Sequence, residues 1–249
     1  MYRGRNEPVP GLSGSAGLIP TLPHPGSGTV RRMAAEHPGP VTSADVDTAV
    51  HLLVDTASTA LDADWDAPAG ALDWSCWETC EHLADSLFYY AAQLSPRVPP
   101  ADAPVPMGWA KRRPGGPENL IFADREAGPA GVLRVVEVCG ALLVAMVDTR
   151  PPSTRAHHVF GQSDPEGFAA MGIVETLVHA QDVFDGLGLD WEPPAAVCAR
   201  TLARLFPNTP PDTDPWQALL WVTGRTELPG RPRLTDWRWY GTPHKSTVD

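Results

Sequence analysis

Residues 164–188 read DPEGFAAMGIVETLVHAQDVFDGLG, and this stretch decides the fold because it carries both a start and a stop signal for one long helix. Asp164 can cap the N-terminus and Pro165 suits the first helical turn, while Gly186 or Gly188 suits the end. Most positions between these signals are apolar. The stretch therefore predicts a long helix that is largely packed against other parts of the protein.

Two further helices are predicted upstream by capping residues followed by apolar stripes. Thr42 and Ser43 carry hydroxyl groups that can cap the first helix. Ser75 and Glu78 form a capping box that opens the second helix, which is expected to run to about Leu94.

A third long helix is predicted at residues 132–147 (VLRVVEVCGALLVAMV). Because it is apolar on nearly every side, we expect it to lie centrally, with a strand as the alternative given its many β-branched residues. A long irregular connection is expected over residues 96–129, with at most a short element near 120–122. Two shorter helices are expected at 194–205 and 215–222.

Together these signals predict an all-α protein in which residues 41–206 form an up-down four-helix bundle. A short C-terminal extension, part helical and part irregular, is expected over residues 207–249. Residues 1–40 are rich in Pro, Gly and Ser and have no sustained periodicity, so we expect a disordered N-terminal extension.

The composition suits a soluble, cytoplasmic protein. The 249 residues are 43% hydrophobic with a net charge of −11, and the longest basic run is Lys111–Arg113. We therefore expect no binding to nucleic acid or to an anionic membrane. We expect that no apolar stretch reaches the roughly 18 residues that span a bilayer, and the N-terminus lacks the apolar core of a signal peptide. Small molecules or proteins are the expected partners, and the sequence leaves the oligomeric state open.

The four cysteines are expected to be reduced and to pack as small buried hydrophobic residues. None of them forms a CxxC pair, so neither a disulfide framework nor a zinc ribbon is indicated. They are Cys76, Cys80, Cys139 and Cys198.

Three side chains that can bind a metal share one face of the helix predicted at 164–188. Glu175, His179 and Asp182 are separated by four and three residues, and these spacings repeat along one helical face. Zn²⁺ accepts both imidazole nitrogen and carboxylate oxygen. A solvated polar face is the simpler interpretation of a lone ExxxH, but Phe168 and Met171 flank this arc, so it is not a clean solvent face.

A second histidine, His82, lies in the segment CEHLAD of another predicted helix and points about 160° away from that helix's apolar stripe. Its position counts against a core role and fits either a ligand at a groove of the bundle or an ordinary surface residue. The Glu-x-x-His pattern of diiron bundles, HExxH and G-x-S-x-G are all absent. His157 and His158, in the loop before residue 164, are expected to be a solvated pair.

The segments WETCEHLAD (77–85) and VETLVHAQDVFDGLG (174–188) together resemble the metal-binding domain of the mycothiol-dependent maleylpyruvate isomerase family, within the DinB-like superfamily. The resemblance implies a DinB-like bundle that holds one Zn²⁺ or similar divalent ion through His82, Glu175 and His179. The remaining coordination positions would be open to water or a thiol. Asp182 would lie behind these ligands and orient one of them.

The resemblance also implies an enzyme that uses a low-molecular-weight thiol, such as mycothiol, to isomerise a small electrophile or to transfer the thiol to it. The characterised enzymes have a larger C-terminal domain that supplies a catalytic arginine, whereas the part of this chain after residue 205 is short. A non-catalytic module that binds metal or a partner, and a helical interaction domain without metal, are the alternatives. The arginines that could replace the family's arginine by charge are Arg225, Arg231, Arg233 and Arg238.

Overall fold

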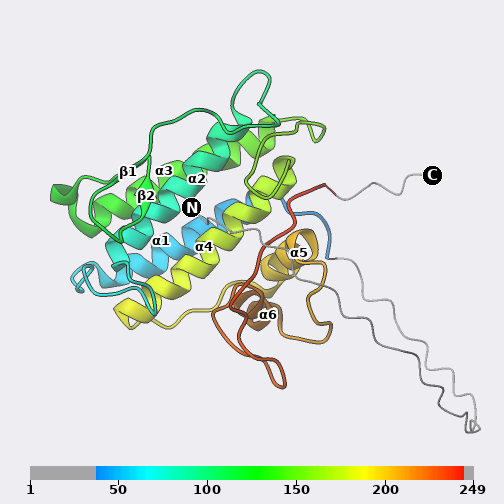
Figure 1. Ribbon diagram of the computed structural model, residues 1–249. Coiled ribbons are helices and arrows are strands. Elements are labelled where there is room, and N and C mark those ends of the chain that lie inside the picture. Colours follow the sequence, from blue (N-terminus) through cyan, green and yellow to red (C-terminus); the bar gives the residue numbers. More distant parts are fainter. Residues whose placement is uncertain (1–37, 244–249) are drawn as a thin grey trace, which may run out of the picture. The chain divides into compact units, whose positions relative to one another are not determined.

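The computed structural model describes residues 38–243, which contain six α-helices and one two-stranded sheet (Figure 1). The predicted all-α bundle is confirmed. Residues 1–37, which make up nearly all of the segment predicted to be disordered, lie outside the described residues.

The first two helices begin at the predicted capping residues. Helix α1 spans Ser43–Ala57 and is followed by a short 3-10 helix, η1 (Ser58–Ala60). The Thr42 hydroxyl accepts a hydrogen bond from the N–H of Asp45, and the Asp45 carboxylate accepts one from the N–H of Thr42. Helix α2 spans Cys76–Leu94 and has the predicted capping box between Ser75 and Glu78. Local hydrogen bonding therefore sets where both helices start.

The other two bundle helices are α3 (Gly128–Thr149), which follows the 3-10 helix η2 (Arg125–Ala127), and α4 (Pro165–Leu187). The Asp164 carboxylate accepts from the N–H of Gly167, and Gly188 ends α4 in the left-handed conformation (φ 70°). Both ends of α4 thus use the residues that the sequence pattern indicated. The strand alternative for 132–147 is wrong, because this segment lies within α3.

Each of α1 and α2 packs against both α3 and α4, so α1 and α2 occupy opposite corners of the bundle. Gly172 of α4 allows one close approach, since a Cβ atom there would lie 2.5 Å from Leu143 Cδ2 of α3. The α2–α4 pairing matters most for function, because it brings one predicted metal ligand of α2 beside two of α4.

Helix α3 is not central, which corrects the expectation from its sequence. Val138 and Leu142 on its outer side are 54% and 44% exposed. A helix at the corner of a bundle buries only the side that faces its neighbours, whatever its composition. The residues that α3 buries are Val132, Leu133, Val136, Cys139, Gly140 and Leu143.

Among the described residues, one helical segment, Arg125–Thr149, is long and apolar enough to cross a membrane by length and composition. The expectation that no stretch would meet this test is therefore wrong. Only 33% of the most apolar window is buried in the structure, in keeping with the exposed outer side of α3. This segment contains α3, which packs along α1 and α2.

The connection between α2 and α3 contains two short strands, β1 (Ala110–Lys111) and β2 (Glu118–Asn119), which pair in antiparallel register. The sequence indicated only a short element slightly downstream, near residues 120–122. Pairing of residues across a long loop leaves no local periodicity, which explains why the strands were not predicted.

Two shorter helices follow, α5 (Ala195–Leu205) and α6 (Pro215–Val222), close to the ranges predicted. The chain after α6 returns to the bundle (Figure 1): the N–H of Tyr240 donates to the carbonyl of Leu205, and the Ser163 hydroxyl donates to the carbonyl of Gly241. The predicted extension is thus tied to the loop that starts α4.

All four cysteines are buried and free, as predicted. Burial raises the pKa of each thiol, to about 11 for Cys76 and to about 12 for Cys139 and Cys198. These thiols are therefore packing groups at neutral pH and not nucleophiles.

Candidate metal centre

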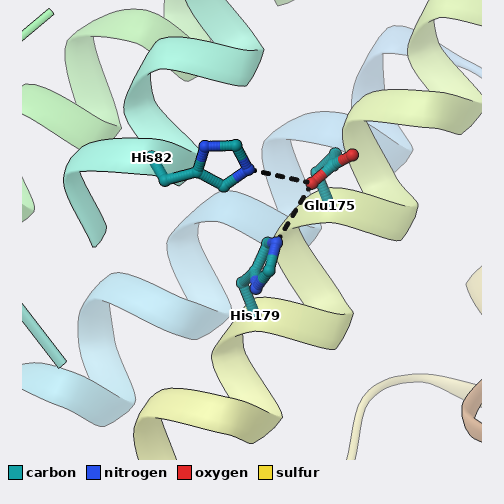
Figure 2. Close-up of side chains that lie close together, drawn as sticks. All are labelled: His82, Glu175 and His179. Carbon is teal, nitrogen blue, oxygen red and sulfur yellow. Dashed lines mark ion pairs between the residues drawn. The ribbon is translucent and has the colours of Figure 1, made fainter. Parts of the chain in front are cut away.

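Helix α4 places Glu175 and His179 side by side, one helical turn apart (Figure 2). Their i, i+4 spacing brings Oε2 of Glu175 within 3.2 Å of Nε2 of His179. Both side chains are largely buried, with 16% and 10% of their surface exposed. One turn of α4 therefore offers an oxygen and a nitrogen donor at nearly the same point.

Helix α2 supplies the third donor from the opposite side. Nε2 of His82 lies 4.0 Å from Oε2 of Glu175, so both imidazoles approach the same carboxylate oxygen (Figure 2). The two rings are 5.2 Å apart and nearly perpendicular, at 88°. Among the described residues, His82, Glu175 and His179 are the group of potential ligands whose donor atoms converge, all within 4.8 Å of one another.

The donor set fits a divalent ion such as Zn²⁺. Two ligand atoms that each lie about 2 Å from one tetrahedral ion are themselves roughly 3.3 Å apart. The separations from Oε2 of Glu175 are 3.2 and 4.0 Å, and all three donors lie within 4.8 Å of one another, so side-chain rotations can bring them to that spacing. Two imidazoles with one carboxylate also make a common ligand set of catalytic zinc sites, which keep a coordination position open.

Asp182 lies behind His179, as the family resemblance implied. Nδ1 of His179 and Oδ2 of Asp182 are 3.0 Å apart, and the Arg225 guanidinium donates to the same Asp182 oxygen at 2.9 Å. An ionised Asp182 accepts only, so Nδ1 of His179 carries a proton and Nε2 is left to bind a metal. The C-terminal segment thereby reaches the site through Arg225.

Tyr90 supports the other α4 ligand. Its hydroxyl donates to Oε1 of Glu175 at 3.4 Å, which leaves Oε2 facing the two histidines. Tyr90 is buried and in contact with the ring of His158, which lies against Trp239 of the C-terminal segment. An aromatic cluster that includes the C-terminal segment therefore packs behind the carboxylate.

The electrostatics of the site call for a cation. Burial opposes ionisation of Glu175, but hydrogen bonding to His179 and the charges of His179, His82 and Arg225 outweigh burial and lower its pKa to about 2. Burial likewise opposes protonation of His179, but Asp182 and Glu175 raise its pKa to about 9. Burial and the charge of His179 lower the pKa of His82 to about 4. The two carboxylates exceed the one guanidinium by one negative charge, which a proton or a metal ion can balance.

Trp74 forms a wall of the site beside both histidines. Its ring centroid lies 4.8 Å from that of His82 and 6.5 Å from that of His179. The indole Nε1 donates to the carbonyl of Gly115 at 3.0 Å, which ties Trp74 to the loop between β1 and β2. An aromatic surface therefore lines the site next to the donor atoms.

The structure brings together all four residues singled out from the sequence, namely His82, Glu175, His179 and Asp182. The side chain of His82 is 16% exposed where α2 packs on α4, so it is neither a core residue nor a fully solvated surface residue. Periodicity could not show this, because the same outward direction on α2 suits a groove and a free surface.

Of the four candidate arginines, only Arg225 is observed in contact with a predicted site residue. Arg231 lies over the ring of Trp221, Arg233 donates to the carbonyl of Gly224, and Arg238 lies over Phe160 and Tyr240. Charge alone could not separate these arginines, because their contacts depend on how the irregular C-terminal segment folds back.

The expectation of a solvated His157 and His158 pair is wrong for His158, which is buried. Its ring lies among Phe160, Phe168, Tyr90 and Trp239, and burial lowers its pKa to about 4. Phe160 belongs to the same loop as His158, but Tyr90, Phe168 and Trp239 come from three other parts of the chain, and the local loop composition carries no signal for them.

The fold and the site define a helical-bundle protein with a candidate centre of two histidines and one glutamate. Residues 46–184 match the mycothiol maleylpyruvate isomerase N-terminal domain family, and the chain belongs to that family. Comparisons with curated proteins and with solved structures gave no significant match.

Proposed function

We propose that this protein is a metal-dependent enzyme that uses a low-molecular-weight thiol, such as mycothiol, as an isomerase or an S-transferase. The observation that carries the proposal is the convergence of Nε2 of His82, Oε2 of Glu175 and Nε2 of His179 in a chain of this family. The resident metal would be a divalent ion, with Zn²⁺ favoured by the mixed nitrogen and oxygen donors.

When bound, such an ion would lower the pKa of a coordinated thiol, so that the sulfur would be a thiolate at neutral pH. The protein's own contribution is to fix the donors. Asp182 keeps the proton of His179 on Nδ1, and Tyr90 keeps Oε2 of Glu175 turned towards the histidines. Burial opposes ionisation of Asp182, but hydrogen bonding to His179 and the charges of His179 and Arg225 outweigh burial and lower its pKa. These contacts orient the side chains of His179 and Glu175 before any ligand arrives.

The substrate would be a small electrophile with a polarised double bond. In the proposed reaction the thiol sulfur forms a bond to one carbon of the double bond, and the neighbouring carbon takes up the thiol's proton. In an isomerase, as for maleylpyruvate, rotation about the resulting single bond is followed by loss of that proton and cleavage of the C–S bond. The free thiol and the trans isomer are then released, whereas an S-transferase would release the adduct itself.

We also propose that the protein acts in the cytoplasm without a nucleic-acid or membrane partner. The net charge of −11 disfavours polyanionic partners, and four free, buried cysteines suit a reducing compartment.

The decisive experiment uses the Co²⁺-loaded full chain, because thiolate coordination to Co²⁺ produces a charge-transfer absorbance. Mycothiol is added with and without maleylpyruvate, and the spectrum and the isomerisation are both followed. We expect the thiol to add a charge-transfer band and the wild type to turn over an electrophile in a thiol-dependent way.

A protein that binds Co²⁺ but shows neither the band nor thiol-dependent turnover of any electrophile would be a non-catalytic metal-binding module, and the proposal would be wrong. His51→Ala is a suitable control variant, since His51 is an exposed histidine of α1 that pairs with Asp47.

A further inference from the structure

In the side chains of His82 and Asn119, three buried polar atoms have no hydrogen-bond partner among the described residues. They are Nδ1 of His82 and both side-chain polar atoms, Oδ1 and Nδ2, of Asn119. Asn119 is only 1% exposed. A buried amide without a partner costs free energy, so a residue of this kind needs an explanation other than packing.

The backbone around Asn119 is held against α2 by two buried carboxylates that flank His82 in the sequence. Asp85 accepts hydrogen bonds from the N–H groups of Leu120 and Ile121, at 2.6 and 2.9 Å. Glu81 accepts from the N–H of Ala123 at 3.0 Å. These bonds fix the chain directly after β2 along the turn of α2 that carries His82.

The two side chains already interact. Burial and the charge of His179 lower the pKa of His82, while Glu175 and the side chain of Asn119 act in the opposite direction. The side chain of Asn119 therefore lies within interaction distance of the His82 ring, but the two side chains do not meet the geometry of a complete hydrogen bond. A small rotation of either side chain would complete it, and the amide can present its oxygen after a flip.

We propose that Asn119 is a positioning residue for His82: its side-chain oxygen accepts a hydrogen bond from Nδ1–H of His82 and so directs Nε2 towards the metal. This inference rests on the metal site of the proposed function. It gives His82 the outer support that Asp182 gives His179. A histidine that binds a metal through Nε2 must carry its proton on Nδ1, and that proton needs an acceptor when it is buried.

The test compares zinc affinity with stability. Zinc dissociation constants of the full chain are measured by competition with a chromophoric chelator, and melting temperatures are measured on the metal-free forms. Asn119→Leu should weaken zinc binding by about 10- to 100-fold, the usual effect of losing an outer partner of a ligand. Its metal-free form should melt at the wild-type temperature or higher, because no complete hydrogen bond is lost.

Asn119→Asp keeps an acceptor and should bind zinc more tightly than Asn119→Leu. Gln93→Leu is the matched control: Gln93 is another buried amide on α2 with an unpartnered Nε2, and its loss should leave zinc affinity at the wild-type value. Nitrogen NMR of the zinc-bound wild type should place the His82 proton on Nδ1, which provides a readout even if a variant does not fold.

Unchanged zinc affinity in Asn119→Leu, in a wild type that binds zinc, would overturn the role of Asn119 and leave the proposed metal site intact. A lower affinity accompanied by a lower melting temperature of the metal-free form would show a merely structural residue and would also overturn it. A wild type that binds no zinc would instead refute the metal site itself, and this inference with it.

Discussion

The two halves of the candidate metal centre are built differently. On α4, each donor has a partner behind it: Asp182 for His179 and the Tyr90 hydroxyl for Glu175. On α2, the single donor, His82, has an Nδ1 atom without a complete hydrogen bond among the residues described. The α4 half is therefore preorganised in the metal-free protein, while the α2 half needs a small adjustment.

This difference indicates that the two halves of the site would contribute differently to metal binding. Glu175 and His179 are fixed relative to each other by one helical turn, so an ion would meet them as a ready pair of donors. His82 must be brought to them by the packing of α2 on α4. Changes on α4 should therefore affect metal affinity directly, and changes around α2 should affect how completely the third donor engages.

The largest effect is expected for His179→Ala, which removes one of the two donors of the preorganised half. Metal affinity should fall by more than the roughly 100-fold that marks loss of an outer partner. Isothermal titration with Zn²⁺ would measure it. If His179→Ala bound zinc as tightly as His51→Ala, the α4 half would not be the core of the site.

A smaller effect is expected for Asp182→Asn, which replaces the charged acceptor behind His179 and leaves Arg225 without its ionic partner. Zinc affinity should fall by about 10- to 100-fold. Asp185→Asn is the matched control, because Asp185 lies on the same helix but accepts a hydrogen bond from the Gln181 side chain and not from His179. Equal affinities for the two variants would contradict the role given to Asp182.

Tyr90→Phe should have a modest effect, because the Tyr90 hydroxyl makes a single hydrogen bond to the Glu175 carboxylate, and at 3.4 Å that bond is long and therefore weak. Such a bond contributes about 0.5–1.5 kcal/mol, or roughly 2- to 12-fold in affinity. Chelator competition can resolve a change of this size. A loss as large as that of Asp182→Asn would show that the two α4 donors depend equally on their partners.

Arg200→Gln should leave zinc affinity unchanged and alter only the pH dependence of stability. Burial raises the pKa of Asp45, but its bonds to Arg200 and Thr42 outweigh burial and lower the pKa in the folded state. The pair therefore stabilises the fold above the ordinary carboxyl pKa of about 3.9, and that contribution is lost as the pH falls through the lowered value.

Urea unfolding at neutral and acid pH would test this. The wild type should be more stable than Arg200→Gln at pH 7, and the difference should shrink towards pH 3. A difference that is the same at both pH values would mean that the Arg200–Asp45 pair does not act through the charge of Asp45.

Local signals in the sequence predicted the bundle helices well, because Thr42, Ser75 and Asp164 cap their helices through short-range hydrogen bonds. The α4 ligands were visible for the same reason, since one helical period relates them. The exposure of the outer face of α3 was not predicted, because an apolar composition does not say how many neighbours a helix has.

Three residues that interact with the predicted ligands were beyond prediction, unlike Asp182. Asn119 and Arg225 lie on β2 and on the chain after α6, and not on the helices that carry Glu175 and the histidines. Tyr90 shares α2 with His82, but it contacts Glu175 of α4, and no spacing along α2 indicates that contact. Arg225 emerged from the sequence only as one of four arginines. The tertiary packing decides which arginine contacts Asp182, and a single sequence does not show that packing.

Zinc titration of the full chain after treatment with a chelator tests the central claim most directly, with His82→Ala, Glu175→Gln and His179→Ala measured beside the wild type. The structure predicts one equivalent of zinc per wild-type chain and a large loss of affinity in each of the three variants. A wild type that binds no zinc, or three variants that bind it as tightly as the wild type, would contradict the assignment of the site.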